Sequence, residues 1–292
     1  MELQWPLILF TTLTAWACGT FSAQGVLALK GAGKKSQQLL VIVSVVLLAL
    51  SGIAVFFHLQ HWERIFNGFG HITSGITQEL IAIVVFVVIA VAYFVMARKS
   101  DDGGTVPAWC AWAAIVIGVV LAAVCAHSYM MPARPAWDSV LEVLSIVGAA
   151  FLLGPATVAV VLAINGEDFP GMGQIAVIGS AIGAVFTVAY AAFLQVSGGM
   201  YVQVGHYFDP THPTKAVMDA AATAAGQAPL LWIGAVIVGA AVPLVCSVLA
   251  KKKGDQASWK LFGAVSVAAA LIGAVCLRVA FYNVGLSVFM FY

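Results

Sequence analysis

Charged side chains are scarce in this chain. Only 9% of its 292 residues are Asp, Glu, Lys or Arg, while 62% are hydrophobic. A soluble globular domain carries about 25% charged residues, so this composition excludes a water-facing surface over most of the molecule. The net charge of +1 gives no basis for binding nucleic acid. We therefore expect the lipid bilayer to cover most of the protein.

Paired cysteines are also missing. The five cysteines stand singly in or beside apolar runs, and none belongs to a Cys-x-x-Cys motif. A metal cluster requires thiolates at close spacing, so we expect no metal site and no iron–sulfur cluster in this chain. We interpret the thiols as small buried hydrophobes. They are Cys18, Cys110, Cys125, Cys246 and Cys276.

Long apolar runs are what the chain has in place of charge. Eight of them approach the roughly 20 residues that a membrane-spanning helix needs, and they are continuous rather than alternating, which favours helices over a barrel. No polar block between them is long enough to fold alone. We expect an all-α integral membrane protein whose residues 1–292 form a single eight-helix domain. The predicted spans are 6–29, 38–57, 80–97, 108–131, 141–164, 174–196, 229–250 and 261–284.

The cations are distributed unevenly between the two sides of the predicted bundle. Three stand on one side, at Arg64, Arg134 and Lys215, and Arg278 lies inside the last span. The positive-inside rule therefore predicts a cell (cytoplasmic) membrane protein with both termini on the outer, non-cytoplasmic side. The nine cations on the cytoplasmic side are Lys30, Lys34, Lys35, Arg98, Lys99, Lys251, Lys252, Lys253 and Lys260.

All the histidines fall on the predicted outer side. Two outer loops, 58–79 and 197–228, carry most of them, and the first loop has an apolar face typical of a short interfacial helix. Such clustering favours proton or metal chemistry near the outer surface. The histidines are His58, His61, His71, His127, His206 and His212, and the apolar face comprises Trp62, Ile65, Phe66 and Phe69.

Three kinds of chemistry could use these residues. One b-type haem between His58 and His127 is an alternative, because axial histidines on facing helices hold such a group. A transporter would place an ionisable residue deep in the membrane, as Arg278 is placed. A quinol-oxidising site needs a base for the hydroxyl protons and an apolar slot for the ring, and the outer membrane edge near His58 offers both. Glu79 precedes the third span, so it can face the same interfacial pocket as His58.

Short motifs then resemble a known family. The N-terminal stretch Trp5–Thr11, the pair His58-Leu59 and the later Arg64-Ile65-Phe66-Asn67 and Gln78-Glu79 are similar to the membrane anchor subunit of bacterial dimethyl sulfoxide reductases. The stretch Arg278–Tyr282 looks like that family's Arg-x-x-Phe-Tyr. The sequence departs from the family at Gln60-His61-Trp62, where the family has Gly-Ser-Pro.

This resemblance implies a function. Anchors of this family bind menaquinol, contain no haem, and pass electrons to an iron–sulfur subunit that feeds a molybdopterin catalytic subunit. The matching positions imply His58 as proton acceptor, Glu79 as proton relay and Arg64 as a quinol contact, with His61 and Arg278 as further quinol-binding candidates. The alternatives are an eight-helix transporter or permease, and a quinone subunit of the polysulfide- or nitrite-reductase type.

Overall fold

The fold is a bundle of long antiparallel helices. The computed structural model describes residues 3–59, 61, 67, 71–201 and 219–286, and within these ranges eight helical segments are long and apolar enough to cross a membrane. The predicted all-α architecture with eight spans is therefore confirmed. The elements are α1 Trp5–Leu29, α2 Gln37–Phe56, α3 Gly75–Lys99, α4 Ala108–His127, α5 Val140–Ile164, α6 Met172–Val196, α7 Ala220–Gly226, the π-helix η4 Pro229–Ala241, α8 Val242–Lys253 and α9 Gln256–Val284.

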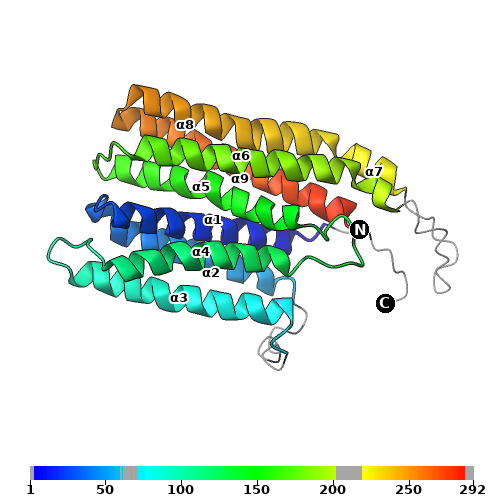
Figure 1. The fold of residues 1–292 in the computed structure, drawn as a ribbon, viewed down its shortest axis with the longest axis horizontal. Helices are drawn as coiled ribbons and strands as arrows, with labels where there is room; N and C mark the ends of the chain where they lie inside the picture. The colour runs from blue at the N-terminus through cyan, green and yellow to red at the C-terminus, as the bar shows by residue number, and fades with distance from the viewer. Residues whose placement is uncertain (1–2, 60, 62–66, 68–70, 202–218, 287–292) are drawn as a thin grey trace.

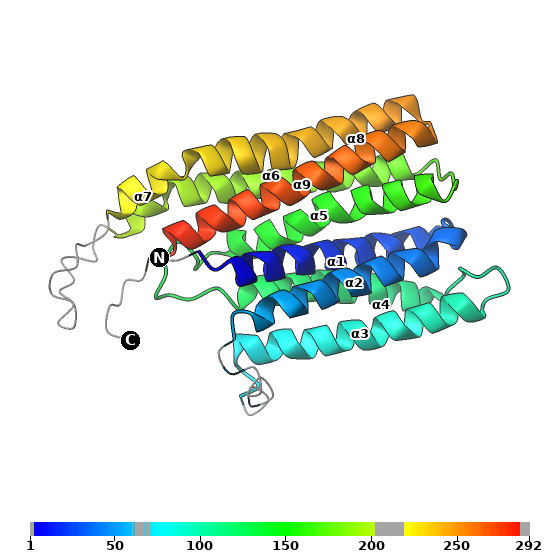
Figure 2. The same cartoon turned by 180° about the vertical axis from the view of Figure 1, so that it is seen from behind.

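The bundle has two halves that meet along α1 and α5. Helices α1 to α4 make the first half, and α6, η4, α8 and α9 pack with α5 in the second (Figure 1). The reverse view shows α1 lying against α2 on one side and near α5 on the other (Figure 2). The most buried spans are α1 and α5, as expected for helices at the centre of a bundle.

Small residues allow the two halves to approach closely. A side-chain carbon added at Gly19 of α1 would lie 2.1 Å from the carbonyl oxygen of Ala150 on α5, and one at Gly154 would lie 2.1 Å from that of Gly19. Within lipid, helix association depends on this kind of close packing rather than on hydrophobic burial. The contact is reinforced where the indole of Trp16 donates a 2.7 Å hydrogen bond to the Thr157 hydroxyl.

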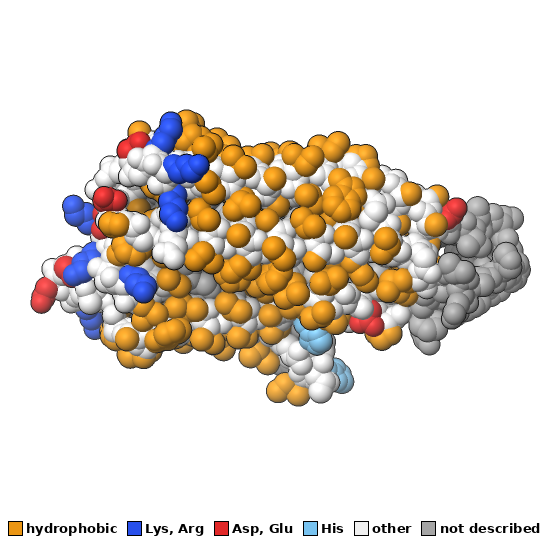
Figure 3. Space-filling view, turned by 45° about the horizontal axis from the view of Figure 1, so that its top comes forward, with side chains coloured by type: hydrophobic (Ala, Val, Ile, Leu, Met, Phe, Trp, Pro, Cys, Tyr) orange, Lys and Arg blue, Asp and Glu red, His pale blue; other side chains and the backbone are white. Residues whose placement is uncertain are grey.

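The two ends of the bundle differ in charge. We call the end where α1 begins and α9 finishes the terminal end, and the opposite one the lysine end (Figure 1). Lys and Arg gather at the lysine end, while hydrophobic side chains cover the middle (Figure 3). All nine cations that the sequence groups on one side fall at the lysine end, in the linkers or the adjoining helical turns.

Polar contacts tie the linkers together at the lysine end. The Lys34 ammonium lies 2.6 Å from the Asp102 carboxylate, and this ion pair, together with hydrogen bonds from Thr105 and Gly104, holds the pKa of Asp102 below its usual range. The backbone N–H of Lys35 donates to the carboxylate of Glu167, 3.0 Å away in the α5–α6 linker. The α1–α2 linker is thereby joined to both of its neighbours.

Several helix ends differ from the predicted spans. Helix α3 begins at Gly75, five residues before the predicted start. The prediction missed its first turn because that turn is polar and does not belong to an apolar run. Glu79 therefore lies inside the helix rather than ahead of it. Helix α4 ends at His127, short of the predicted residue 131. The interfacial helix predicted around Trp62 lies outside the described residues.

The seventh span contains a rare helix type that sequence periodicity did not predict. Residues 229–241 form a π-helix before α8 continues the span. Pro243 stands just past the change of helix type, where its missing N–H interrupts the regular hydrogen-bond series. Gly239 of η4 lies against Gly273 of α9, since an added side-chain carbon would come 2.4 Å from the Gly273 Cα.

Candidate functional site

Glu79 lies in the second turn of α3, near the terminal end. The start of α3 packs directly on the end of α4, because a side-chain carbon added at Gly75 would lie 2.9 Å from the Cα of Ser128. A glycine at this position lets the helices approach, and the next turn of α3 carries Glu79 to the side chains of α4. Local helix packing thus turns this carboxyl toward the protein.

The surroundings of Glu79 supply hydrogen-bonding groups but no cation among the described residues. Its carboxyl interacts with the Cys125 thiol and the Ser128 hydroxyl. The Ser128 hydroxyl already donates a 2.8 Å hydrogen bond to the Cys125 carbonyl, so toward Glu79 it can only accept. The carboxyl oxygen Oε1 is buried and has no hydrogen-bond partner within the part of the chain that the structure describes. This arrangement suits a carboxyl that carries a proton.

The two histidines predicted for the site follow α2. His58 lies two residues beyond the end of α2, and His58 and His61 are both exposed. Helices α2 and α3 are in contact, and the end of α2 and the start of α3 both lie at the terminal end (Figure 2). Arg64, the third predicted contact, lies outside the described residues.

Arg278 occupies a different part of the bundle, within the second half. Its guanidinium lies 2.6 Å from the carboxylate of Glu142 on α5, with both side chains almost fully buried. Glu142 is also close to Tyr190 of α6. The structure therefore places Arg278 in an ion pair with Glu142, while its contact with a quinol stays a prediction.

Aromatic rings connect Arg278 to the loop between α4 and α5. Phe281 stacks on Trp137 at 4.4 Å with an interplanar angle of 11°. The guanidinium of Arg278 lies 4.7 Å from the centre of the Phe281 ring, and that of Arg134 lies 4.5 Å from the Trp137 ring. Two cations thus flank two stacked rings, an arrangement that cation–π attraction stabilises.

Two tyrosines lie between the Arg278 region and α4. The Tyr129 and Tyr282 ring centres are 6.4 Å apart at an angle of 86°. The Tyr282 hydroxyl is buried and makes no hydrogen bond of normal geometry with the described residues. Glu142, Tyr129, Trp137 and Tyr282 were not among the predicted site residues. Glu142 could have been found, because it and Arg278 are the two charged residues within the eight predicted spans.

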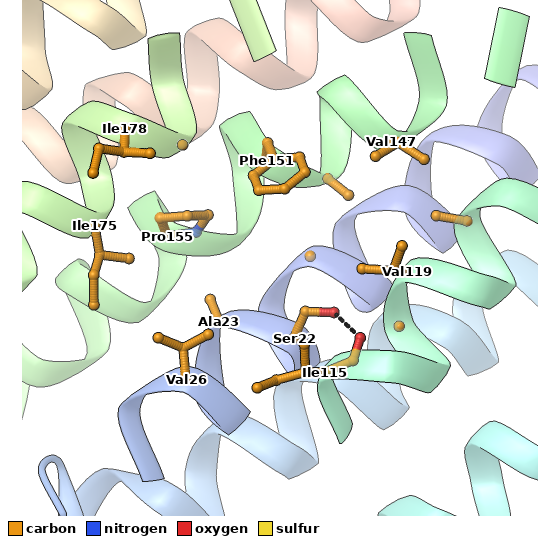
Figure 4. A pocket seen from close by; sticks show the side chains of 15 residues that line it. Ser22, Ala23, Val26, Ile115, Val119, Val147, Phe151, Pro155, Ile175 and Ile178 are labelled. Atoms are coloured by element: carbon orange, nitrogen blue, oxygen red, sulfur yellow. Dashed lines mark hydrogen bonds between the residues drawn. The ribbon is translucent and has the colours of Figure 1, made fainter. Parts of the chain in front are cut away.

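Another cavity lies elsewhere in the bundle and is apolar. It has a volume of about 230 Å³ and opens among α1, α4, α5 and α6. Its walls carry Val119, Phe151, Pro155 and Ile178, and the Ser22 hydroxyl already donates to the Ile115 carbonyl (Figure 4). No lining residue can titrate near neutral pH, so this cavity suits hydrocarbon rather than a group that exchanges protons.

Metal ligands are not brought together within the described ranges. No group of three or more His, Cys, Asp or Glu side chains is placed to hold an ion there. His58, His71 and His127 are all exposed near the terminal end. His206 and His212 lie outside the described residues.

Comparison with known proteins gives the family. A family model described as DMSO reductase anchor subunit (DmsC) matches residues 1–286, which is nearly the whole chain. No curated protein matches it. The transporter and the polysulfide- or nitrite-reductase alternatives are not favoured by this result. With its eight apolar helices, the chain is a multi-pass membrane protein that associates with the catalytic subunits of a reductase, and it belongs to the DMSO reductase anchor subunit (DmsC) family.

Proposed function

We propose that this chain is the quinol-oxidising subunit of its reductase. It takes two electrons and two protons from menaquinol, releases the protons, and passes the electrons to an iron–sulfur subunit that feeds a molybdopterin catalytic subunit. The observation that carries this proposal is the contrast between the two carboxyls inside the bundle. Glu142 is paired with Arg278, whereas Glu79 has a buried oxygen with no partner among the described residues.

A carboxyl without a counter-ion within a membrane helix costs free energy, and such a residue is by default a candidate for a functional role. Oxidation of a quinol requires an acceptor for each hydroxyl proton. In its protonated form Glu79 is neutral and can reside in the bundle, and in its ionised form it can accept a proton from a bound quinol. Its neighbours Cys125 and Ser128 hold the carboxyl in place.

His58 is proposed as the group that accepts the first proton. An imidazole can take up and release a proton, and the exposed position of His58 lets it exchange that proton with water. Glu79 then relays the second proton outward. Arg64 and His61 are proposed to contact the quinol head group. Arg64 matches the family motif, whereas His61 stands in the segment where the sequence departs from it.

We further propose that the terminal end faces outward from the cytoplasmic membrane. Nine cations at the lysine end would then face the cytoplasm, as the positive-inside rule requires. Electrons tunnel efficiently only over short distances, so the iron–sulfur subunit should dock on the terminal end, where Glu79 lies.

Quinol-dependent turnover in the membrane-assembled complex tests the proposal. His58→Ala and Glu79→Gln should each reduce quinol-dependent activity at least about a hundredfold, the lower end of the range that proton-transfer groups contribute. Activity with an artificial soluble electron donor should persist, because that donor bypasses this chain. His127→Ala provides a control, since His127 is also exposed and is the last residue of α4, at the same terminal end. It should leave both activities unchanged.

Two outcomes would contradict the proposal. Persistence of quinol-dependent turnover in both variants would show that neither residue handles the protons. Loss of turnover in His127→Ala, with His58→Ala active, would move the proton acceptor to α4.

A further inference from the structure

A second polar site lies between the two halves of the bundle, among α1, α5 and α9. Thr12 of α1 and Arg278 of α9 are both buried there, with 2% and 5% of their surfaces exposed. The Thr12 hydroxyl and the Nη2 atom of Arg278 have no hydrogen-bond partner among the described residues. Buried polar groups are nearly always hydrogen-bonded, so two such groups without a partner require an explanation.

Both groups line one small cavity. Its walls come from α1, α5 and α9, and its polar lining consists of Thr11, Thr12, Ser145 and Arg278. Thr11 donates to the Leu7 carbonyl of its own helix. Ser145 donates to the Glu142 carbonyl at 2.8 Å. The Thr11 and Ser145 oxygens can still accept a hydrogen bond, but the groups without any partner in the described part of the chain are the Thr12 hydroxyl and Arg278 Nη2.

The size of the cavity limits the ligand. Its volume is about 20 Å³. A site needs roughly 10–15 Å³ of this kind of space to hold one water molecule, so the cavity accommodates one water and excludes a quinone ring. The rest of the wall is mostly apolar, but the two polar groups without a partner favour a water over an empty space, since a cavity that stays empty is normally lined by apolar groups alone.

We propose that this cavity binds one ordered water, which accepts a hydrogen bond from Arg278 Nη2 and exchanges a second with the Thr12 hydroxyl. The water completes the hydrogen bonding of the Glu142–Arg278 ion pair and links it to α1. The first half of the bundle is thereby joined to α5 and α9 by a hydrated, charged contact. This role for Arg278 is structural and does not depend on quinol oxidation.

The direction in which Thr12→Val changes the stability of the protein distinguishes a hydrated cavity from a dry one. Thr12→Val keeps the shape of the side chain and removes the hydroxyl. In a dry cavity this change removes an unpaired polar group and should leave stability equal or higher. In a hydrated cavity it removes a partner of the water and weakens the contact to Arg278. We expect the apparent Tm of the purified complex to fall by about 2–4 °C.

Thr20→Val is the matched control. Thr20 is a buried threonine on the same helix, and its hydroxyl donates to the Trp16 carbonyl of that helix. It should change the apparent Tm by less than Thr12→Val does. If Thr12→Val prevents assembly, Thr12→Ser, which keeps the hydroxyl, should assemble and melt within about 2 °C of the wild type.

A high-resolution map of the complex gives the direct measurement. We expect a density peak at hydrogen-bonding distance, about 2.7–3.2 Å, from both Thr12 Oγ1 and Arg278 Nη2. The proposal is overturned if that position is empty in a map that resolves other buried waters. It is equally overturned if Thr12→Val melts at or above the wild-type temperature, or if Thr12→Ser fails to assemble as Thr12→Val does.

Discussion

The carboxylate of Glu142 and the guanidinium of Arg278 lie 2.6 Å apart inside the bundle, on helices that are far apart in the sequence. Glu142 stands in the first turn of α5, and Arg278 two turns before the end of α9. An isolated charge at this depth would raise the free energy of the folded protein, whereas the attraction within the pair offsets much of that increase. The contact therefore fixes how α9 packs against α5 near the terminal end.

Removing one partner of this pair should destabilise the protein more than removing both. Glu142→Leu and Arg278→Leu each leave a buried charge without its counter-ion, which costs about 3–5 kcal/mol. The double variant leaves neither charge, so its stability should recover much of the loss. The measurement is a double-mutant cycle on the apparent Tm and the membrane level of the chain. Simple additivity of the two single losses would show that the pair does not couple α5 to α9.

The membrane spans and the depth of Arg278 were predictable from sequence, but its pairing with Glu142 was not predicted, and the position of Glu79 was predicted only in part. Apolar runs are recognisable because lipid selects them over the full length of a helix. Glu79 was placed ahead of its helix, because the polar first turn of α3 breaks the apolar run. The contact of Glu79 with Cys125 depends on how Gly75 packs on Ser128. The residue pattern within one helix does not indicate which residues of another helix it contacts.

The glycine at the centre of the bundle should not tolerate a methyl group. In Gly19→Ala the new carbon would meet the Ala150 carbonyl oxygen at 2.1 Å, far inside van der Waals contact, so α1 and α5 would have to separate. We expect a large loss of membrane-assembled complex. Gly52→Ala on α2 is the control, because a side-chain carbon there meets nothing within 4 Å. Equal assembly of the two variants, measured by quantitative blotting of membranes, would contradict the tight α1–α5 contact.

Ser128 should influence the proposed proton relay through Glu79. Ser128→Ala removes one of the two side chains that contact the Glu79 carboxyl. Because the Ser128 hydroxyl can only accept a hydrogen bond from Glu79, it stabilises the protonated carboxyl, and its loss should displace the pH profile of quinol-dependent turnover toward lower pH. The profile with an artificial donor should not move. Ser100→Ala, at the lysine end, serves as the control, and a similar displacement in that variant would exclude a specific effect at Glu79.

The orientation in the membrane can be measured directly. Reporter fusions after Lys35, Lys99 and Lys253 should all show a cytoplasmic location, because these residues belong to the cation-rich linkers at the lysine end. Fusions in the 132–140 loop should show the opposite location. An extracytoplasmic signal at two of the three lysine-end sites would reverse the proposed orientation and the proposed docking side of the iron–sulfur subunit.

The central position of α1 has a consequence for how the chain is made. This helix is synthesised first, yet its Trp16 indole finds its partner, Thr157, only 141 residues later in the chain. Until α5 has entered the membrane, the face of α1 that carries Trp16 and Gly19 is turned toward lipid or toward the insertion machinery. Synthesis interrupted after α4 would therefore leave a fragment whose central helix lacks its contacts with α5 and α9, and such a fragment would be a ready substrate for membrane proteases.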